Sequence, residues 1–184
     1  MTYRQPIAAI FLAAAALAGQ SLESPQFRDY PVRNIFQGRP AAPVFARPEE
    51  RNYRTKIREG VTNGWGVTDA RSEESRPGPN FAGHYLIIKW PCGSPCMMAA
   101  IVDAVSGRIF PPPFHATGDD YFMVPAFGSF PHEGAPIFDY RVDSRLLIAE
   151  ICEHSNERCG THYFEMGTAG LEEIGKSFRS SSSN

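Results

Sequence analysis

The four cysteines are the residues whose type and spacing most readily suggest chemistry. Three residues separate Cys92 from Cys96, and six separate Cys152 from Cys159. Cysteine pairs form disulfides in oxidising compartments, bind zinc as thiolates, or carry out redox reactions as C-x₂-C at the start of a helix. The first pair is C-x₃-C, and strand-forming residues flank both pairs. We therefore expect two structural disulfides, Cys92–Cys96 and Cys152–Cys159. Pairing between the two units and a four-thiolate zinc site remain the alternatives.

His84 is the candidate general base, because an imidazole titrates near neutral pH. It lies between Gly83 and Tyr85 at the start of an expected strand. No serine or cysteine stands beside it, so catalysis would require an acidic residue from 119–120 to converge on it in space. The alternative is an imidazole at a strand edge that is hydrogen-bonded to the nearby loop. No G-x-S-x-G, Walker, dinucleotide-binding or H-E-x-x-H motif is present.

The connection 111–136 is the segment that we expect to bind a partner, because long connections without clear secondary structure are often functional. It contains metal-capable and aromatic side chains, but their loose spacing matches no defined metal geometry. The sequence therefore predicts no metal site and no cofactor. Together with His84, the candidate binding residues are Phe114, His115, Asp119, Asp120, Tyr121, Phe122, Phe127, Phe130 and His132.

The N-terminus has the pattern of a cleavable signal peptide. Arg4 precedes the apolar run IAAIFLAAAALA at residues 7–18, and Ala16-Leu17-Ala18 is a small-x-small cleavage site. The run is shorter than the roughly 20 residues that span a bilayer. We therefore predict cleavage after Ala18, with no membrane span in the mature chain, and a periplasmic or secreted protein in which disulfides form.

Length and composition fit one loop-rich globular domain. The chain has 184 residues, of which 16 are glycine and 16 are proline, and its net charge is −2. Loss of Arg4 makes the mature chain slightly more acidic, which argues against nucleic acid and anionic membrane surfaces as partners. The expected organisation is a signal peptide at 1–18, an extended Pro-rich arm at 19–46, a single β-rich domain at 47–179 and a disordered tail at 180–184.

The expected fold is mainly β with one N-terminal helix. The helix begins at Pro48, carries Tyr53, Ile57 and Val61 on one apolar face, and ends at Asn63-Gly64. Strand-like segments follow at 83–90, 97–105, 108–110, 137–142, 145–151, 161–166 and 171–174, with a short one at 121–124. Asp103 and Asp143 are expected to form turns.

Two stretches of the β region align at an offset of 60 residues. Leu86-Ile87-Ile88 corresponds to Leu146-Leu147-Ile148, and Cys92 corresponds to Cys152. A glycine follows eleven positions after both Cys96 and Cys159. The spacing predicts two repeated three-stranded meanders that form a small sandwich, an open barrel or a propeller-like pair of sheets.

Several motifs resemble a family of small exported bacterial proteins of unknown function. They include Phe81-Ala82-Gly83-His84-Tyr85, Cys92-Gly93 with Cys96, and Cys159-Gly160-Thr161-His162-Tyr163. The resemblance extends over roughly residues 50–175 and departs from the family at Pro91, where a small residue is expected. It implies a single exported unit and carries no activity with it.

These observations favour an exported binding protein without catalysis, of the inhibitor or immunity type. Its partner would be another exported protein or an envelope component. The first alternative is a cell-envelope hydrolase that uses His84 with an acidic residue. The second is a metal-handling periplasmic protein that uses His115, His132 and the aspartates.

Overall fold

The computed structural model describes residues 24–64, 68–69, 72–75, 77–93, 96–112, 123–124, 138–153 and 158–178. Within these ranges, the side chains of 68–75, 92–97, 123–124 and 151–159 are not described. The helices and strands are η1 (Phe27–Asp29), α1 (Pro48–Asn52), α2 (Arg54–Asn63), β1 (Thr68–Asp69), β2 (Ser72–Ser75), β3 (Tyr85–Gly93), β4 (Cys96–Asp103), β5 (Ile109–Phe110), β6 (Met123–Val124), β7 (Phe138–Tyr140), β8 (Leu146–Glu153), β9 (Arg158–Gly167) and β10 (Gly170–Phe178).

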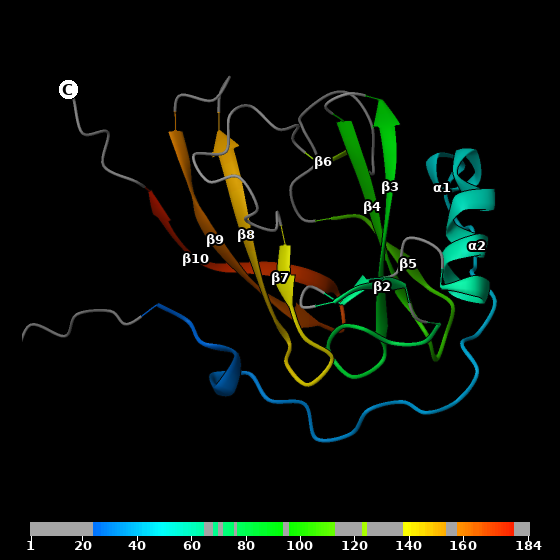
Figure 1. The fold of residues 1–184 in the computed structure, drawn as a ribbon, viewed down its shortest axis with the longest axis horizontal. Coiled ribbons are helices and arrows are strands. Elements are labelled where there is room, and N and C mark those ends of the chain that lie inside the picture. The colour runs from blue at the N-terminus through cyan, green and yellow to red at the C-terminus, as the bar shows by residue number, and fades with distance from the viewer. Residues whose placement is uncertain are drawn as a thin grey trace, which may run out of the picture.

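Two antiparallel sheets dominate the described chain. The first has the order β3-β4-β5, with β6 also paired to β4, and the second has the order β10-β9-β8-β7. Figure 1 shows the two sheets face to face, with α1 and α2 beside the first sheet. The expectation of a mainly β fold with an N-terminal helical region is confirmed, and the described sheets do not close into a barrel.

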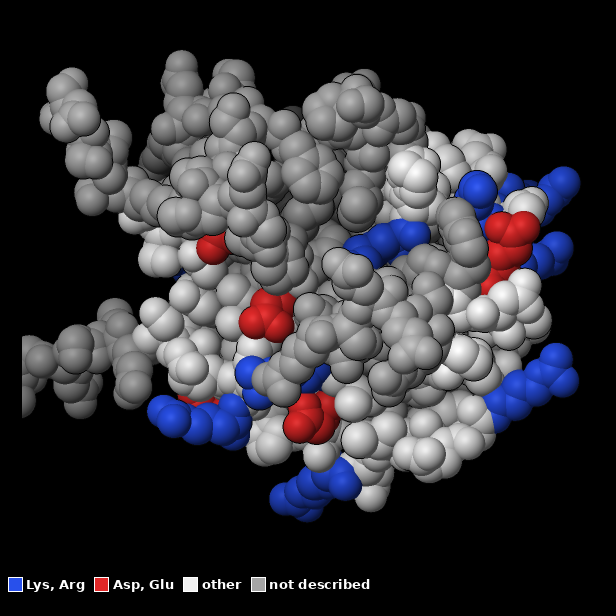
Figure 2. Space-filling view, viewed as in Figure 1, with Lys and Arg blue, Asp and Glu red and all other residues white. Residues whose placement is uncertain are grey.

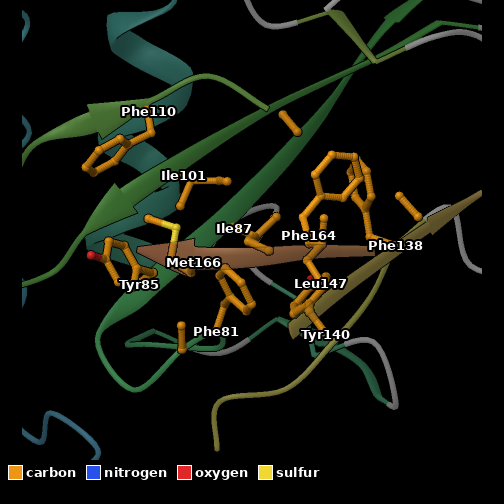
Figure 3. Packing of buried hydrophobic residues seen from close by; sticks show 13 residues of the cluster. Phe81, Tyr85, Ile87, Ile101, Phe110, Phe138, Tyr140, Leu147, Phe164 and Met166 are labelled. Atoms are coloured by element: carbon orange, nitrogen blue, oxygen red, sulfur yellow. The ribbon is translucent and has the colours of Figure 1, made fainter. Parts of the chain in front are cut away.

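The first sheet is buried on both faces, because successive residues of a strand point to opposite sides. Ile87 and Ile101 face the second sheet and pack with Phe138, Leu147 and Phe164 (Figure 3). The alternate residues face the helices. They form a second cluster, which contains Leu86, Ile88, Trp90, Met98, Ala100 and Val102 together with Ile57 and Val61 of α2.

Helix α2 packs closely on β3 through a glycine. Ile57, Gly60 and Val61 are its buried residues, and a Cβ atom on Gly60 would lie 2.5 Å from the Ile88 side chain. Glycine inside a helix costs about 1 kcal/mol relative to alanine. The contact with Ile88 explains why a glycine stands here. The expected apolar face is confirmed, and Tyr53 stands between α1 and α2 with its ring 5.5 Å from that of Trp90.

The segment from Ser24 to Arg47, which we call the arm, passes along one end of both sheets (Figure 1). Near the second sheet, the Val32 amide donates to Asp143 O, and the Arg145 amide donates to Tyr30 O. Near the first sheet, the amides of Ala41 and Val44 donate to the carbonyls of Ala104 and Gly107. The buried Ser144 hydroxyl lies 3.0 Å from Phe27 O and 3.1 Å from Tyr30 O. The arm therefore connects the two sheets.

Asn80 occupies the free edge of β3. Its amide nitrogen donates to Ile87 O at 3.1 Å, and its oxygen accepts from Ile87 N at 2.8 Å. The side chain replaces the hydrogen bonds that a further strand would make. It thereby avoids the cost of roughly 1–3 kcal/mol for each buried backbone group left unpaired.

The expected and observed elements differ in two places. The expected single helix has a break at Tyr53, which separates α1 from α2. The segment 62–80, expected to be a loop, contains the paired strands β1 and β2. None of the described helices is long and apolar enough to cross a lipid bilayer.

Candidate functional site

An open groove of about 730 Å³ lies where the arm crosses the end of the sheets. Residues 31–34 of the arm contribute to its lining, as do Arg145 and Glu165 of the second sheet. His84 and Tyr85 contribute from the first sheet. The described residues that line it are Pro31, Val32, Arg33, Asn34, Ala82, His84, Tyr85, Arg145, Glu165, Met166, Gly167 and Thr168. Since three separate parts of the chain contribute, the groove depends on the docked arm.

His84 lies in this groove without the partners that a catalytic base requires. Its Nε2 atom is 3.8 Å from Asp103 Oδ1, which is beyond hydrogen-bond distance. Asp103 already accepts the Val105 amide at 2.8 Å and the Ser106 hydroxyl at 2.6 Å, so its expected turn-forming role is confirmed. Among the described residues, no hydroxyl or thiol is hydrogen-bonded to the His84 imidazole. The imidazole instead lies against the Tyr85 ring, with ring centroids 4.2 Å apart.

Tyr85 is neutral at physiological pH. Burial raises the pKa of its phenol, the nearby Asp103 carboxylate raises it further, and Arg108 opposes these effects. A neutral phenol can donate a hydrogen bond but is no nucleophile. The histidine and tyrosine of the groove can each form hydrogen bonds, and among the described residues neither of them forms a nucleophile–base pair.

The electrostatic character of the groove is basic. Arg145 is paired with Glu165, with Nη2 at 2.8 Å and Nε at 3.1 Å from Glu165 Oε1. This ion pair occupies the only carboxylate among the described groove-lining residues. Arg33 is exposed and has no ion-pair partner among the described residues. Arg33 therefore gives the groove a preference for an anionic group.

A lysine lies inside the sandwich as a second polar feature. Lys89 follows Ile87 on the inner face of β3, and its ammonium group lies 5.6 Å from the centre of the Tyr140 ring. Tyr140 is completely buried between the sheets. Burial lowers the pKa of Lys89, because a low-dielectric interior disfavours the charged form.

His162 is a third polar feature, located on β9. Its side chain is 4% exposed, and its Nδ1 atom lies 3.0 Å from Glu173 Oε2 on β10. Its Nε2 atom has no hydrogen-bond partner in the described part of the chain. The imidazole stacks on Phe164 and meets Phe178 edge-on. This contact holds the edge strand β10 against β9.

Most of the sequence-predicted binding residues cannot be compared with this groove. His84 is the only one of them that the structure describes. The others lie outside the described residues: Phe114, His115, Asp119, Asp120, Tyr121, Phe122, Phe127, Phe130 and His132. Within the described ranges, no three histidine, cysteine, aspartate or glutamate side chains lie close enough together to hold a metal ion.

The cysteines can be located only through their backbone. Cys152 and Cys159 are directly opposite each other on β8 and β9. In the first sheet, Cys96 pairs with Gly93, and the register shifts between Pro91 and Gly93, beside Cys92. The two disulfides remain predictions.

Sequence reasoning missed the groove, because its charged residues are far apart in the chain. Arg33 belongs to the arm, Arg145 follows the turn at Asp143 and Ser144, and Glu165 lies near the end of β9. No local spacing links them. The only signal in the sequence is the position of Arg145 at the start of a predicted strand, which shows that it lies at one end of a sheet.

Comparisons with protein-family models, with curated proteins and with solved structures each give no match. The resemblance to a family of exported proteins therefore remains a prediction. The structure itself shows a mainly β protein with two antiparallel sheets and a basic groove beneath its arm.

The close contact between the arm and Gly83 allows a test of whether this contact holds the arm in place. A Cβ atom at Gly83 would lie 2.5 Å from Val32 Cγ1 and 2.7 Å from Asn34 O, and the backbone there has a φ of +81°. We expect Gly83→Ala to displace the arm and lower the free energy of unfolding by about 2 kcal/mol. Limited proteolysis should then cleave within residues 24–46. Gly175→Ala is the matched control, because a Cβ atom at Gly175 would have no neighbour within 4 Å. Equal protease resistance of both variants would show that the arm is not held at Gly83.

The buried Lys89 predicts a specific pH dependence. Because its folded-state pKa lies below its unfolded value, the unfolded chain binds more protons between the two values. The contribution of Lys89 to the free energy of unfolding therefore rises as pH increases through that window and is lowest below it. We expect wild type to gain stability relative to Lys89→Met between neutral pH and about pH 10 in urea titrations. Lys56→Met, at an exposed position, should show no such trend. A constant difference between Lys89→Met and wild type would contradict the assignment.

Proposed function

We propose that this chain is an exported, non-catalytic binding protein that receives an acidic segment of another exported protein in the groove beneath its arm. The observation that carries the proposal is the basic lining of the groove, in which Arg33 has no described ion-pair partner. Glu165, the only acidic residue in the described lining, is already neutralised by Arg145. An incoming carboxylate therefore meets uncompensated positive charge, which favours and steers its association.

The arrangement of His84 supports binding over hydrolysis. A general base must lie within about 2.6–3.2 Å of the proton that it removes, and a nucleophile is activated by such a base. His84 has no described hydroxyl or thiol at that distance, and its acidic neighbour Asp103 is engaged in a turn. The hydrolase alternative keeps one supporting observation, which is that His84 lies in a groove large enough for a substrate.

Export belongs to the same proposal, and so do two disulfides. The N-terminal pattern of charge, apolar run and small residues supports export. The opposed positions of Cys152 and Cys159 support the second disulfide, since opposed residues of antiparallel strands are about 4.5–5.5 Å apart and disulfide-linked Cα atoms are about 4.4–6.8 Å apart. Cys92 and Cys96 rest on sequence spacing alone.

Mass spectrometry tests export and oxidation together. Protein produced with its own leader should begin at Gly19 and should be four hydrogens lighter than its fully reduced form. Peptides from a non-reducing digest should link Cys152 to Cys159. An intact N-terminus, or four free thiols after export, would refute this part of the proposal.

Charge reversal at Arg33 tests the groove. The probe is a fluorescently labelled hexaglutamate peptide, with hexaglutamine as its neutral counterpart, and anisotropy measures binding to the purified protein. Hexaglutamate should bind more tightly than hexaglutamine, and Arg33→Glu should weaken hexaglutamate binding by about tenfold. Arg51→Glu is the matched control, because it makes the same charge change on α1, away from the groove.

These measurements also distinguish the binding function from the hydrolase alternative. Equal binding of the two peptides, or equal losses of hexaglutamate binding in Arg33→Glu and Arg51→Glu, would refute the groove proposal. Release of soluble fragments from purified cell-wall material by wild type but not by His84→Ala would replace the binding function with the hydrolase.

A further inference from the structure

The sign of charge changes along this chain. Residues 24–64 contain eight basic and four acidic side chains, whereas residues 65–184 contain nine basic and fifteen acidic ones. All eight basic residues of the first segment are exposed, namely Arg28, Arg33, Arg39, Arg47, Arg51, Arg54, Lys56 and Arg58. Two of its four acidic residues are less available, because Glu50 is buried and accepts the Arg47 amide at 2.9 Å and Glu59 is half-buried, whereas Asp29 and Glu49 are exposed.

Part of this positive charge is concentrated on α1 and α2, which carry Arg51, Arg54, Lys56 and Arg58, with Arg47 at the N-cap of α1. The arm leads directly into α1 and α2, which cover the first sheet (Figure 1). Figure 2 shows several lysine and arginine side chains projecting from the side where these helices lie. An excess of basic side chains on one face of an otherwise acidic protein is a signature of binding to a polyanionic surface.

Within this basic face lies a recessed pocket of about 450 Å³ between the arm and α2. Two arginines line it, Arg39 from the arm and Arg58 from α2, and none of the described lining residues is acidic. Its remaining lining is mostly apolar and consists of Pro40, Ala42, Pro43, Val61, Thr62 and Pro77. The pocket therefore combines two guanidinium groups with an apolar floor.

Arg39 and Arg58 are suited to binding a phosphate group. The Arg58 guanidinium lies 5.2 Å from the centre of the Phe45 ring, and stacking on an aromatic face leaves the N–H groups of its edge available. Arg39 is exposed and has no ion-pair partner in the described chain. A planar guanidinium binds phosphate oxygens through two parallel hydrogen bonds, which a lysine cannot do.

Exposed apolar side chains on the arm and on the turn that it contacts favour a lipid surface as the partner. Val44 of the arm is 56% exposed, and Val105, on the turn that the arm contacts, is 59% exposed. Ile35 of the arm is 40% exposed. Basic residues with interspersed exposed apolar ones are typical of proteins that lie on anionic membranes, where each basic residue near the surface strengthens binding.

We propose that the arm and the α1–α2 face dock on an anionic lipid surface, with a phosphate-bearing headgroup in the pocket between Arg39 and Arg58. The site is separate from the groove, so that either assignment can fail without the other. Overall net charge hides this property, because the acidic strands compensate for the basic N-terminal segment.

Vesicle flotation tests the proposal with the purified chain. The vesicles are phosphatidylcholine alone or phosphatidylcholine with phosphatidic acid. The protein should float only with the phosphatidic acid vesicles, and binding should weaken as salt is added. The Arg39→Gln/Arg58→Gln variant should bind about tenfold more weakly. Arg51→Gln/Arg54→Gln is the matched control: it removes the same charge from the docking face outside the pocket, so it should weaken binding clearly less than the pocket variant does.

Vesicle binding by the two variants either supports or overturns the pocket. A clearly larger loss of vesicle binding in the pocket variant than in the control supports the site. Equal losses in both variants would reduce the effect to general electrostatic attraction and overturn the pocket. Binding of inorganic phosphate at Arg39 and Arg58, seen by NMR, without vesicle flotation would overturn the membrane assignment in favour of a soluble phosphate compound. Circular dichroism of each variant verifies that loss of binding is not loss of fold.

Discussion

Burial of the first sheet on both of its faces is the constraint on which the rest of this structure depends. Ile87 and Ile101 must meet the second sheet, whereas Leu86, Ile88 and Val102 must meet α2. Each such side chain contributes about 1.5–3 kcal/mol when it is removed from water. A one-residue slip of β3 against β4 would exchange the two sets and bring Lys89 to the helix side. The register therefore fixes the helix, the sandwich core and the position of the buried lysine together.

The arm follows from the same constraint. The loops at one end of the two sheets contact each other, since the amides of Ala82 and Gly83 donate to the carbonyls of Arg141 and Val142, and the arm adds further contacts there. It donates amides to Asp143 in the second sheet's turn and to Ala104 beside β4. Gly83 allows it to approach the start of β3, because any larger residue would collide with Val32 and Asn34. The groove is the space between the arm and the ends of the strands that the arm crosses, and residues of both line it.

Much of this fold could be predicted from the sequence because it is encoded locally. The spacing of Tyr53, Ile57 and Val61 predicts the face of α2, and the alternating apolar residues of 83–90 predict β3. The 60-residue offset has a structural counterpart, since Ile87 and Leu147 both face the inter-sheet core. The groove could not be predicted in this way. Arg33 and Arg145 are separated by more than a hundred residues, and only the pairing of the arm with the β7–β8 turn brings them together.

The net charge of the chain is a second example of a property from which the sequence alone gives an incomplete prediction. The sum over the mature chain is mildly negative, and from that sum alone an anionic surface is an unfavourable partner. The sum is the wrong quantity, because charges on opposite sides of a domain of this size are separated by more than the Debye length of about 8–10 Å and act almost independently. What a surface senses is the local set of charges, and here one helical layer carries Arg51 on α1 and Arg54, Lys56 and Arg58 on α2. The local charge of that layer, and not the sum over the chain, therefore governs its attraction to a partner.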